Sequence, residues 1–342
     1  MNHISQVKRG PLVLEGRVRA RAGVNIALIK YWGKAPARAA HDLNLPACPS
    51  LSLTLDALYS DTRARFCPDA SDDRVVLDGE ALEGAGLDRM RPVLDRVRAM
   101  AEVEAPFEIE TTNTVPTAAG LASSASGAAA LAAACARCAG LEMSEGALSA
   151  IARLGSGSGS RSVFGGWAAW DGPEARALFG PEHWDLSFVV ALVSREKKSI
   201  SSRDAMRQTA ATSPLYAPWV ESAQQAFDQA LLALEGRDLE ALVSAMETST
   251  MRMHASAMGA NPPILYWKPA SLGAIEVVKS LRSSGVLCGW TMDAGPNVKV
   301  LCHTKDAPRV AGALAEVDGV PTTLIAKPGQ GVSVALEPEV GS

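Results

Sequence analysis

The sequence TVPTAAGLASSASG, residues 114–127, leads directly into an alanine-rich segment that continues to Ala139. Eight of the nine residues from Thr117 to Ala125 are Ala, Ser, Thr or Gly, and alanine is the strongest helix former. The pattern predicts a loop of small residues that ends where a helix begins. A helix start exposes unpaired backbone N–H groups and the positive end of the helix dipole. Because Gly120 lets an anion approach that backbone closely, the stretch predicts a phosphate-binding loop.

An ordinary capped helix is the alternative interpretation, because Ser and Thr are favoured at helix N-caps. Capping alone does not require such a long run of small residues. Neither common nucleotide-binding motif fits the chain. A P-loop needs a Lys that this loop lacks, and the pattern Gly-x-Gly-x-x-Gly, which begins at Gly155, has Ser160 in place of the third glycine.

The composition is typical of a globular protein, with 342 residues of which 47% are hydrophobic and 20% are charged. This length predicts two domains or one large domain. The net charge is −4 and the longest basic run is Lys197-Lys198, so we expect no nucleic-acid surface. We also expect no membrane span or secretory signal. The apolar run Gly127–Ala136 is too short for a bilayer, and the N-terminus alternates charges with short apolar pieces.

The chain contains six cysteines, and its five histidines are scattered. The pair Cys135-x-x-Cys138 has the spacing of a redox or zinc half-site, but no second pair of Cys or His completes it. Because the pair lies inside the alanine-rich segment, we interpret both residues as buried small hydrophobic side chains. The sequence therefore predicts a reduced, cytoplasmic protein without a structural metal.

Hydrophobic periodicity predicts alternating strands and helices in the first two thirds of the chain. Strands are expected at Leu51–Leu55, Arg74–Glu80 (with a turn), Phe107–Thr111 and Phe188–Val193. Helices are expected at Leu87–Val103, in the alanine-rich segment, and near Ser144–Leu154.

After about residue 195 the pattern changes to longer helices followed by strands. The predicted helices are Tyr216–Leu234, Leu239–Met258, Leu272–Ser283 and Ala307–Val317. The predicted strands are Gly289–Met292, Val298–Cys302, Thr322–Ile325 and Gly331–Leu336. The whole predicts an α+β protein with an N-terminal lobe, residues 1–195, and a C-terminal lobe, residues 196–342.

Two segments carry candidate anion-binding groups. In residues 25–34, Lys30 and Lys34 flank an aromatic pair directly after a strand-like run, and with the Tyr31 hydroxyl they could bind a multiply charged anion. The alternative is a strand end whose lysines are only solvated. In residues 155–166, hydroxyls and backbone N–H groups surround Arg161, which could grip a carboxylate or phosphate with two hydrogen bonds. The alternative there is a flexible linker.

Two further charged residues have a structural and a functional interpretation. Arg203 lies among the hydroxyls of residues 199–204, where the alternative is a helix N-cap with a solvated arginine. Asp293 ends a strand-like run before Ala-Gly-Pro, and an Asp before a turn is usually structural. Its functional interpretation is a catalytic carboxylate on a loop that rigid strands hold in place.

Together these segments resemble the diphosphomevalonate decarboxylase family of the GHMP (galactokinase–homoserine kinase–mevalonate kinase) superfamily. The small-residue loop alone would indicate only the superfamily, whereas the set of motifs is specific to the decarboxylase branch. The matching stretches are NIALIKYWGK (25–34), PTAAGLASSAS (116–126), SGSGSRSVFGG (156–166), SSRDAM (201–206), RMHASAMGANPP (252–263) and TMDAGPNVKVL (291–301).

The resemblance implies the two-lobed GHMP fold, in which the N-terminal lobe is like domain 2 of ribosomal protein S5 and the C-terminal lobe is ferredoxin-like. It implies a cleft that takes ATP, Mg²⁺ and substrate, and a cytoplasmic homodimer. The implied reaction is ATP-dependent decarboxylation of (R)-5-diphosphomevalonate to isopentenyl diphosphate, ADP, phosphate and CO₂. Phosphorylation of the tertiary 3-hydroxyl makes it a leaving group, and its loss drives the departure of the carboxylate as CO₂.

The resemblance also implies roles for individual residues. Those implied in catalysis are Asp293, Lys30, Arg161 and Asn25. Those implied in substrate binding are Tyr31, Lys34, Ser156, Ser158, Arg161 and Arg203. Those implied in ATP binding are Asn113, Gly120, Leu121, Ala122, Ser123 and Ser124, with Ser123 or Ser124 as the Mg²⁺ ligand.

One segment departs from the family pattern. After Lys34 the chain is longer than in many members, and Pro46–Ser50 replaces a more polar stretch, which leaves one wall of the substrate pocket undetermined. The alternatives within the fold are a 5-phosphomevalonate decarboxylase, a mevalonate 3-kinase-like enzyme, and a non-catalytic binding protein. The presence of Lys30, Arg161 and Asp293 favours a decarboxylase, and Lys34 and Arg203 favour a diphosphate substrate.

Overall fold

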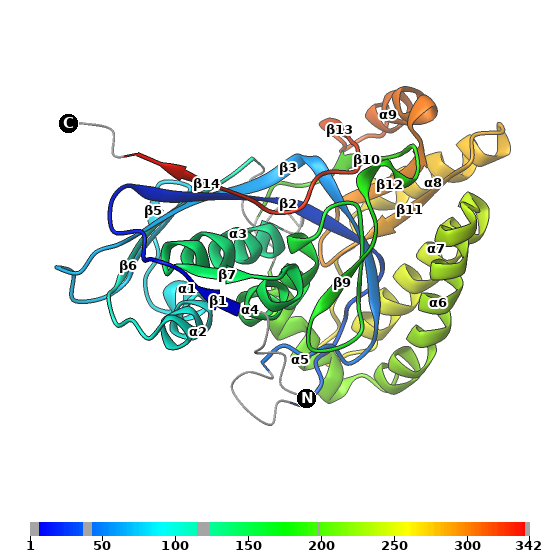
Figure 1. Ribbon diagram of the computed structural model, residues 1–342. Helices are drawn as coiled ribbons and strands as arrows, with labels where there is room; N and C mark the ends of the chain where they lie inside the picture. Colours follow the sequence, from blue (N-terminus) through cyan, green and yellow to red (C-terminus); the bar gives the residue numbers. More distant parts are fainter. Residues whose placement is uncertain (1–6, 37–42, 115–122, 197–198, 339–342) are drawn as a thin grey trace.

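The computed structural model describes residues 7–36, 43–114, 123–196 and 199–338, and two main sheets organise them (Figure 1). The larger sheet has the strand order β14-β2-β3-β6-β4-β5, and β8 and β9 extend it through β3. Its strands are β2 (Arg17–Ile29), β3 (Ser50–Phe66), β4 (Arg74–Leu77), β5 (Glu80–Ala81), β6 (Phe107–Asn113), β8 (Trp167–Trp170), β9 (Ala175–Phe179) and β14 (Ser333–Glu337).

The alanine-rich helix lies directly on this sheet. Helix α3 (Ser123–Cys138) packs against β2 and β3, and every residue from 128 to 136 is buried. Small side chains let a helix that is apolar all round fit between the sheet and the outer helices. Cys135 and Cys138 are both buried in this core, which confirms their interpretation as small hydrophobic residues. The other elements of this part are α1 (Ala85–Asp88), α2 (Arg91–Ala101), α4 (Glu145–Gly155), the 3₁₀ helix η3 (Gly157–Val163), β1 (Val7–Arg9) and β7 (Leu141–Met143).

The second sheet is antiparallel, with the strand order β11-β12-β10-β13. Its strand β10 has the sequence LSFVVAL and is buried throughout. Because successive side chains point to opposite faces, Phe188 and Val190 enter one core, with α6 and α7, while Val189 and Ala191 enter another, with α8 and α9. The elements here are β10 (Leu186–Leu192), β11 (Cys288–Met292), β12 (Val298–His303), β13 (Thr322–Ala326), α5 (Ser202–Thr212), α6 (Tyr216–Gly236), α7 (Leu239–Met258), α8 (Pro269–Ser283), α9 (Ala307–Ala315), η4 (Pro181–His183) and η5 (Thr304–Asp306).

Three local predictions need correction or comment. The predicted helix Leu87–Val103 is interrupted, because residues 87 and 88 belong to α1 (Ala85–Asp88) and α2 begins at Arg91, where Pro92 fits the first turn without losing a hydrogen bond. The flexible-linker alternative for residues 155–166 is also wrong, since η3 is buried. Ser201 caps α5, as the structural alternative for residues 199–204 predicted.

Among the described residues, no helix has both the length and the apolar character to cross a membrane.

The division into lobes 1–195 and 196–342 stays a prediction, and strand pairing crosses it. Strand β10 lies before the predicted boundary but pairs with β12 and β13, which lie after it. In the opposite sense, the C-terminal strand β14 returns to pair with β2 (Figure 1). Each sheet therefore includes a strand from the other side of the predicted boundary.

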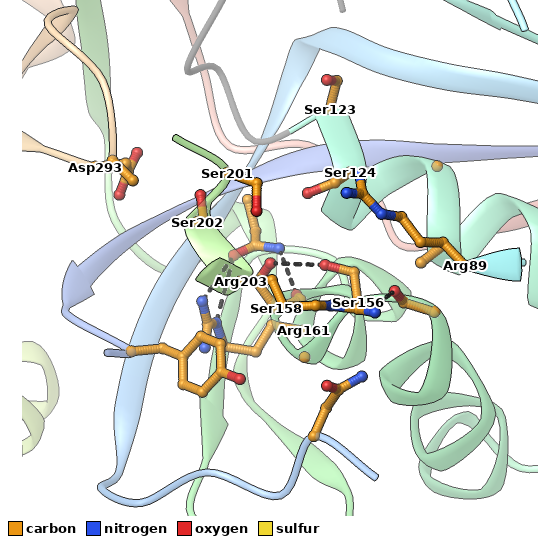
Figure 2. Close-up of a pocket in the computed structure, with 18 of the residues that line it drawn as sticks. Arg89, Ser123, Ser124, Ser156, Ser158, Arg161, Ser201, Ser202, Arg203 and Asp293 are labelled. Carbon is orange, nitrogen blue, oxygen red and sulfur yellow. Dashed lines mark hydrogen bonds between the residues drawn. The ribbon is translucent and has the colours of Figure 1, made fainter. Parts of the chain in front are cut away.

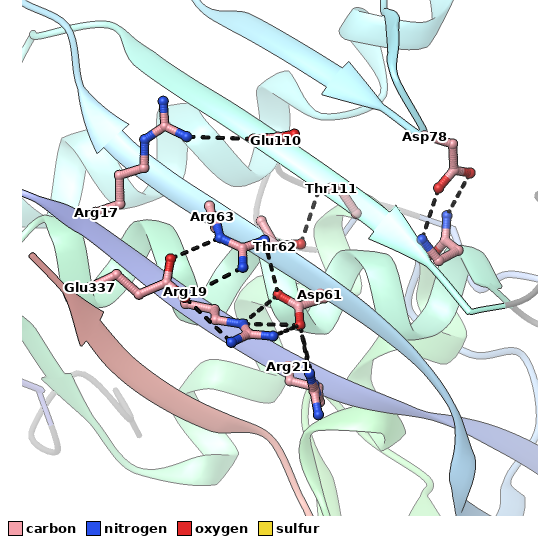
Figure 3. Close-up of polar contacts among 11 residues, drawn as sticks. Arg17, Arg19, Arg21, Asp61, Thr62, Arg63, Asp78, Glu110, Thr111 and Glu337 are labelled. Atoms are coloured by element: carbon pink, nitrogen blue, oxygen red, sulfur yellow. Dashed lines mark hydrogen bonds and ion pairs between the residues drawn. The ribbon is translucent and has the colours of Figure 1, made fainter. Parts of the chain in front are cut away.

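A charged network on the larger sheet fastens β14 to its neighbours (Figure 3). The Asp61 carboxylate on β3, 6% exposed, accepts hydrogen bonds from Arg19 Nε at 2.8 Å and Arg21 Nη2 at 2.9 Å. Glu337 on β14 accepts a hydrogen bond of 2.8 Å from Arg63 Nε. Burial would raise the pKa of Asp61, but the hydrogen bonds from Arg19 and Arg21 outweigh it and hold the pKa below its usual value.

We expect Asp61→Asn to lower the free energy of unfolding by about 1–3 kcal/mol, because it removes the counter-charge of Arg21 and leaves Arg19 with its 3.4 Å ion pair to Glu337. The contribution of Asp61 is complete above its unfolded-state pKa of about 3.9 and is lost as the pH falls through the lower folded-state pKa. Denaturant unfolding of both proteins at pH 7 and at about pH 3 measures this. A difference that did not shrink at the lower pH would contradict the assignment.

Candidate active site

A cavity of about 380 Å³ lies where the two sheets and α3 meet. Figure 2 shows Asp293 on one side of it, Ser123 and Ser124 on another, and Arg203 between them. Every predicted site residue that the structure describes lines this cavity: Asn25, Lys30, Tyr31, Lys34, Asn113, Ser123, Ser124, Ser156, Ser158, Arg161, Arg203 and Asp293. The predicted Gly120, Leu121 and Ala122 lie outside the described residues. The roles of all these residues stay predictions.

Two buried lysines hold the carboxylate of Asp293. Lys30 follows the end of β2, is 2% exposed, and places its Nζ 2.6 Å from Asp293 Oδ1. Lys299 on β12 is fully buried, and its Nζ lies 3.0 Å from Asp293 Oδ2. Lys30 Nζ also donates to the carbonyl of Ala27 at 2.9 Å, and its backbone N–H donates to Ser249 Oγ at 3.0 Å. The carboxylate therefore has an ammonium group on each oxygen.

Burial and the neighbouring charges shift the pKa values of both Asp293 and Lys30. Burial would raise the pKa of Asp293, but attraction to Lys299 and Lys30 outweighs it and holds the pKa well below its usual range. Burial lowers the pKa of Lys30 to about 8, against the attraction of Asp293 and with repulsion from Lys299 and Arg161. At neutral pH Asp293 is ionised and Lys30 keeps its proton.

The turn that carries Asp293 is fixed from several sides. Asn297 is fully buried, and its Oδ1 accepts hydrogen bonds from the backbone N–H groups of Val193 at 2.7 Å and Ser194 at 3.0 Å. Ser271 Oγ, at the start of α8, donates to the carbonyl of Pro296 at 2.6 Å. The sequence DAGPN thus makes a rigid turn between β11 and β12 rather than a mobile loop.

Arg161 approaches the cavity from η3 and is held by neutral oxygens. Its Nε donates to Ser52 Oγ at 3.0 Å, its Nη1 donates to Ser50 Oγ, and its Nη2 donates to Asn25 Oδ1 at 3.2 Å. Asn25 in turn donates to Ser162 Oγ at 2.7 Å. Burial lowers the pKa of Arg161 to about 10, against the attraction of Asp293, so the guanidinium stays charged. A buried cation held by neutral partners keeps its charge available for an anionic ligand.

A second set of cations lines another wall of the cavity. Lys34 Nζ donates to Asn44 Oδ1 at 2.6 Å, and Arg203 Nη2 donates to the carbonyl of Gly155 at 3.4 Å. Burial, with repulsion from Arg203 and Arg207, lowers the pKa of Lys34 to about 8. The first turn of α5 adds hydroxyl groups and the positive end of a helix dipole. This wall suits a multiply charged anion.

Tyr31 packs tightly between these two walls. Its ring centroid lies 4.8 Å from that of Trp170, and a Cβ on Gly157 would lie 2.5 Å from its hydroxyl oxygen. In the parts of the chain that the structure describes, no group hydrogen-bonds this buried hydroxyl. Because buried polar groups are normally paired, the Tyr31 hydroxyl is available to a ligand in the cavity.

A third side of the cavity is built around the start of α3. Ser126 Oγ lies 2.8 Å from Ser60 Oγ, and Ser60 Oγ donates to Asn113 Oδ1 at 2.6 Å. Asp78 accepts the backbone N–H of Asn113 at 2.8 Å, which fixes that residue at the end of β6. Among the described residues no cluster of carboxylates, histidines or cysteines could hold a metal alone. The serine hydroxyls fit a magnesium ion that nucleotide phosphates carry.

Comparisons with known proteins agree with this geometry. The family model "Diphosphomevalonate decarboxylase-like N-terminal domain" matches residues 22–177, and "Mevalonate 5-diphosphate decarboxylase C-terminal domain" matches residues 188–329. The chain belongs to the diphosphomevalonate decarboxylase family.

Individual members of the diphosphomevalonate decarboxylase family are similar over most of their length. The diphosphomevalonate decarboxylase of Gibberella zeae is 36% identical over 324 residues, which cover 87% of this chain and 84% of that protein. The mevalonate diphosphate decarboxylase structure from Staphylococcus aureus has a TM-score of 0.87 at 34% identity, covering 98% of this chain and 100% of that one. The structure "MDDEF in complex with MVAPP, AMPPCP and Magnesium" has a TM-score of 0.86 at 38% identity, covering 94% and 99%. These structures confirm the predicted α+β fold of the GHMP superfamily.

Sequence reasoning missed several residues of this decarboxylase-family cavity. Asn44 and Arg89 line it, as do Ser201 and Ser202 at the start of α5. Lys299 does not line the cavity, but its Nζ forms an ion pair with Asp293 Oδ2. A signal existed for Lys299, because a lysine within the apolar strand Val298–His303 needs a buried partner. Asn44 and Arg89 had no comparable signal, since neither lies in one of the matching stretches.

We expect Gly157→Ala to lower the free energy of unfolding by about 1–3 kcal/mol, because the added methyl group collides with the packed Tyr31 ring. Gly172→Ala is the matched control, since a Cβ there would meet no atom within 4 Å. Its effect should stay within about 0.5 kcal/mol. Denaturant unfolding compares the two variants, and equal effects would show that the Gly157–Tyr31 contact is not tight.

Proposed function

We propose that this chain catalyses the ATP-dependent decarboxylation of (R)-5-diphosphomevalonate to isopentenyl diphosphate, ADP, phosphate and CO₂. The observation that carries the proposal is the placing of Asp293, flanked by two buried lysines, in the same cavity as Arg161 and the start of α3. The complex of its relative MDDEF with MVAPP, AMPPCP and magnesium supports a phosphorylated substrate, an ATP-like nucleotide and magnesium as ligands.

The two halves of the reaction need different groups. Phosphoryl transfer from ATP to the tertiary 3-hydroxyl depends mainly on positioning and charge neutralisation. In the second half, the C–O bond to the new phosphate and the C–C bond to the carboxylate break. The electron pair of the C–C bond then forms the double bond of the product. Asp293 would lie at the hydroxyl, and Arg161 with Ser156 would hold the carboxylate that leaves as CO₂.

Asp293 is better suited to orient the hydroxyl than to remove its proton. A carboxylate whose pKa is held well below its usual range is a weak base. It still accepts a hydrogen bond strongly, because it stays charged at neutral pH. Lys30, at 2.6 Å from Oδ1, would neutralise the negative charge that develops on the hydroxyl oxygen.

The diphosphate would occupy the wall formed by Tyr31, Lys34, Ser158 and Arg203. Two separated cations and the start of α5 match the charge of a diphosphate better than that of a monophosphate. The Tyr31 hydroxyl would donate the hydrogen bond that it does not make within the described protein.

On the other side, the ATP phosphates would lie against the start of α3. Ser123 and Ser124 would contact the phosphates and the magnesium ion they carry, and Asn113 would lie nearer the adenine. Bound magnesium would neutralise charge on the phosphates. The homodimer and the cytoplasmic location are further proposals, which rest on the family resemblance and on the six free cysteines.

Incubation with Mg-ATP and each of diphosphomevalonate, 5-phosphomevalonate and mevalonate tests the function. We expect CO₂ and ADP in equal amounts from diphosphomevalonate, and much less from the other two. Faster CO₂ release from 5-phosphomevalonate than from diphosphomevalonate would identify a 5-phosphomevalonate decarboxylase. ADP without CO₂ would identify a mevalonate 3-kinase-like enzyme. Neither product from any substrate would contradict an enzymatic function.

We expect Arg203→Ala mainly to raise KM for diphosphomevalonate, because a diphosphate remote from the reacting carbon contributes binding that is the same in the ground and transition states. Arg207→Ala, one turn further along α5, is the matched control. Its side chain is 80% exposed and pairs with Asp204. Steady-state kinetics separates the effects, and a fall in kcat at constant KM would contradict the assignment of Arg203.

A further inference from the structure

Lys299 lies inside the motif TMDAGPNVKVL but has no role in the scheme above. It occupies a central strand of the second sheet, opposite Thr291 on β11 and Val190 on β10. Its side chain is fully buried and does not line the cavity. An ammonium group in such a place is costly unless a charged partner compensates for it.

The partner is the oxygen of Asp293 that faces away from solvent. Oδ2 is buried and lies 3.0 Å from Lys299 Nζ. The other oxygen, Oδ1, lies 2.6 Å from Lys30 Nζ. With only one cation, a carboxylate can rotate about its Cβ–Cγ bond and exchange its oxygens. Two cations on opposite oxygens fix that rotation.

Charged and titratable groups face Asp293 from several elements. Lys30 comes from the end of β2, Lys299 from β12, Arg161 from η3 and His254 from α7. Burial, with repulsion from Lys30, lowers the pKa of His254 to about 3, so this imidazole is neutral at physiological pH. Asp293 is therefore one anion among three cations, and Lys299 is the one of these that lies outside the cavity wall.

We propose that Lys299 is a positioning residue, whose ammonium group fixes the buried Oδ2 of Asp293 and so sets the direction in which the carboxylate meets the substrate hydroxyl. This role rests on the function proposed above. Lys299 acts on kcat through Asp293, without touching the substrate. Its effect should vanish when Asp293 can no longer act.

A double-mutant cycle tests this dependence, with kcat and KM measured for wild type, Lys299→Met, Asp293→Asn and the double variant. Asp293→Asn should lower kcat by about 10²–10⁴-fold. Lys299→Met should lower kcat by roughly 10–100-fold, as expected for a misplaced group, with little change in KM. In the double variant Lys299→Met should cause no further loss. Lys299→Arg, which keeps the charge, should recover part of the activity.

The pH profile gives a readout that a purely structural role would not move. Removing the charge of Lys299 removes a repulsion from Lys30, so the alkaline limb of kcat/KM should move to higher pH. The measurement is best made in a Lys34→Arg background, because the pKa of Lys34 is also about 8. Arg282→Met is the control, since it breaks an ion pair with Glu247 in the same lobe, outside the cavity. Arg282→Met should lower the melting temperature and leave the pH of the alkaline limb of kcat/KM unchanged.

The outcomes separate this role from the function on which it rests. No turnover by wild type would overturn the proposed function and this role with it. Wild-type turnover with unchanged kcat and pH profile in Lys299→Met would overturn the role alone. So would a loss from Lys299→Met that is equally large with and without the Asp293→Asn substitution. If Lys299→Met does not fold, Lys299→Gln, which keeps a hydrogen-bond donor without the charge, provides the same comparison.

Discussion

The burial of the Asp293 carboxylate between two lysines is the constraint on which the rest of the structure depends. Lys30 follows a strand of the larger sheet, whereas Asp293 and Lys299 belong to the smaller one. Removing one of these partners would leave the other charge buried without compensation, and breaking such a pair costs about 3–5 kcal/mol. The pairing of β10 and of β14 across the predicted lobe boundary supports the same arrangement, because each sheet includes a strand from the other side of that boundary.

The same constraint explains why the cavity favours anions although the chain carries a net charge of −4. Asp293 is satisfied by its lysines, and Arg161 is held by hydroxyl and amide oxygens rather than by a carboxylate. Positive charge is therefore left over on two walls of the cavity, around Arg161 and around Lys34 and Arg203. A net negative protein can bind a highly charged substrate because this local arrangement, rather than the total charge, sets the field there.

The sequence predicted the parts of this design that follow from local rules. Helix α7 was predicted at Leu239–Met258 without error, because Asp238 caps its start and Gly259 follows its end. The small-residue stretch predicted a helix directly after a loop, but α3 begins at Ser123, within the predicted loop. Long-range pairing was not predictable in this way. A strand such as β14 has no local feature that selects β2 as its partner, and Lys299 could be interpreted only once Asp293 was known to lie beside it.

The position of Asp293 also limits the kind of catalysis that the fold can perform. A strong general base needs a pKa near the working pH, and two adjacent ammonium groups move this carboxylate far from that condition. The arrangement would instead supply fixed charges that need no reorganisation when the reaction occurs, and such preorganised stabilisation is usually the largest single catalytic contribution. Phosphoryl transfer to a tertiary alcohol depends more on such preorganisation than on proton removal before the transition state. The cost of burying three cations around one anion is therefore a requirement of this chemistry, and the two-sheet scaffold is what makes that burial stable.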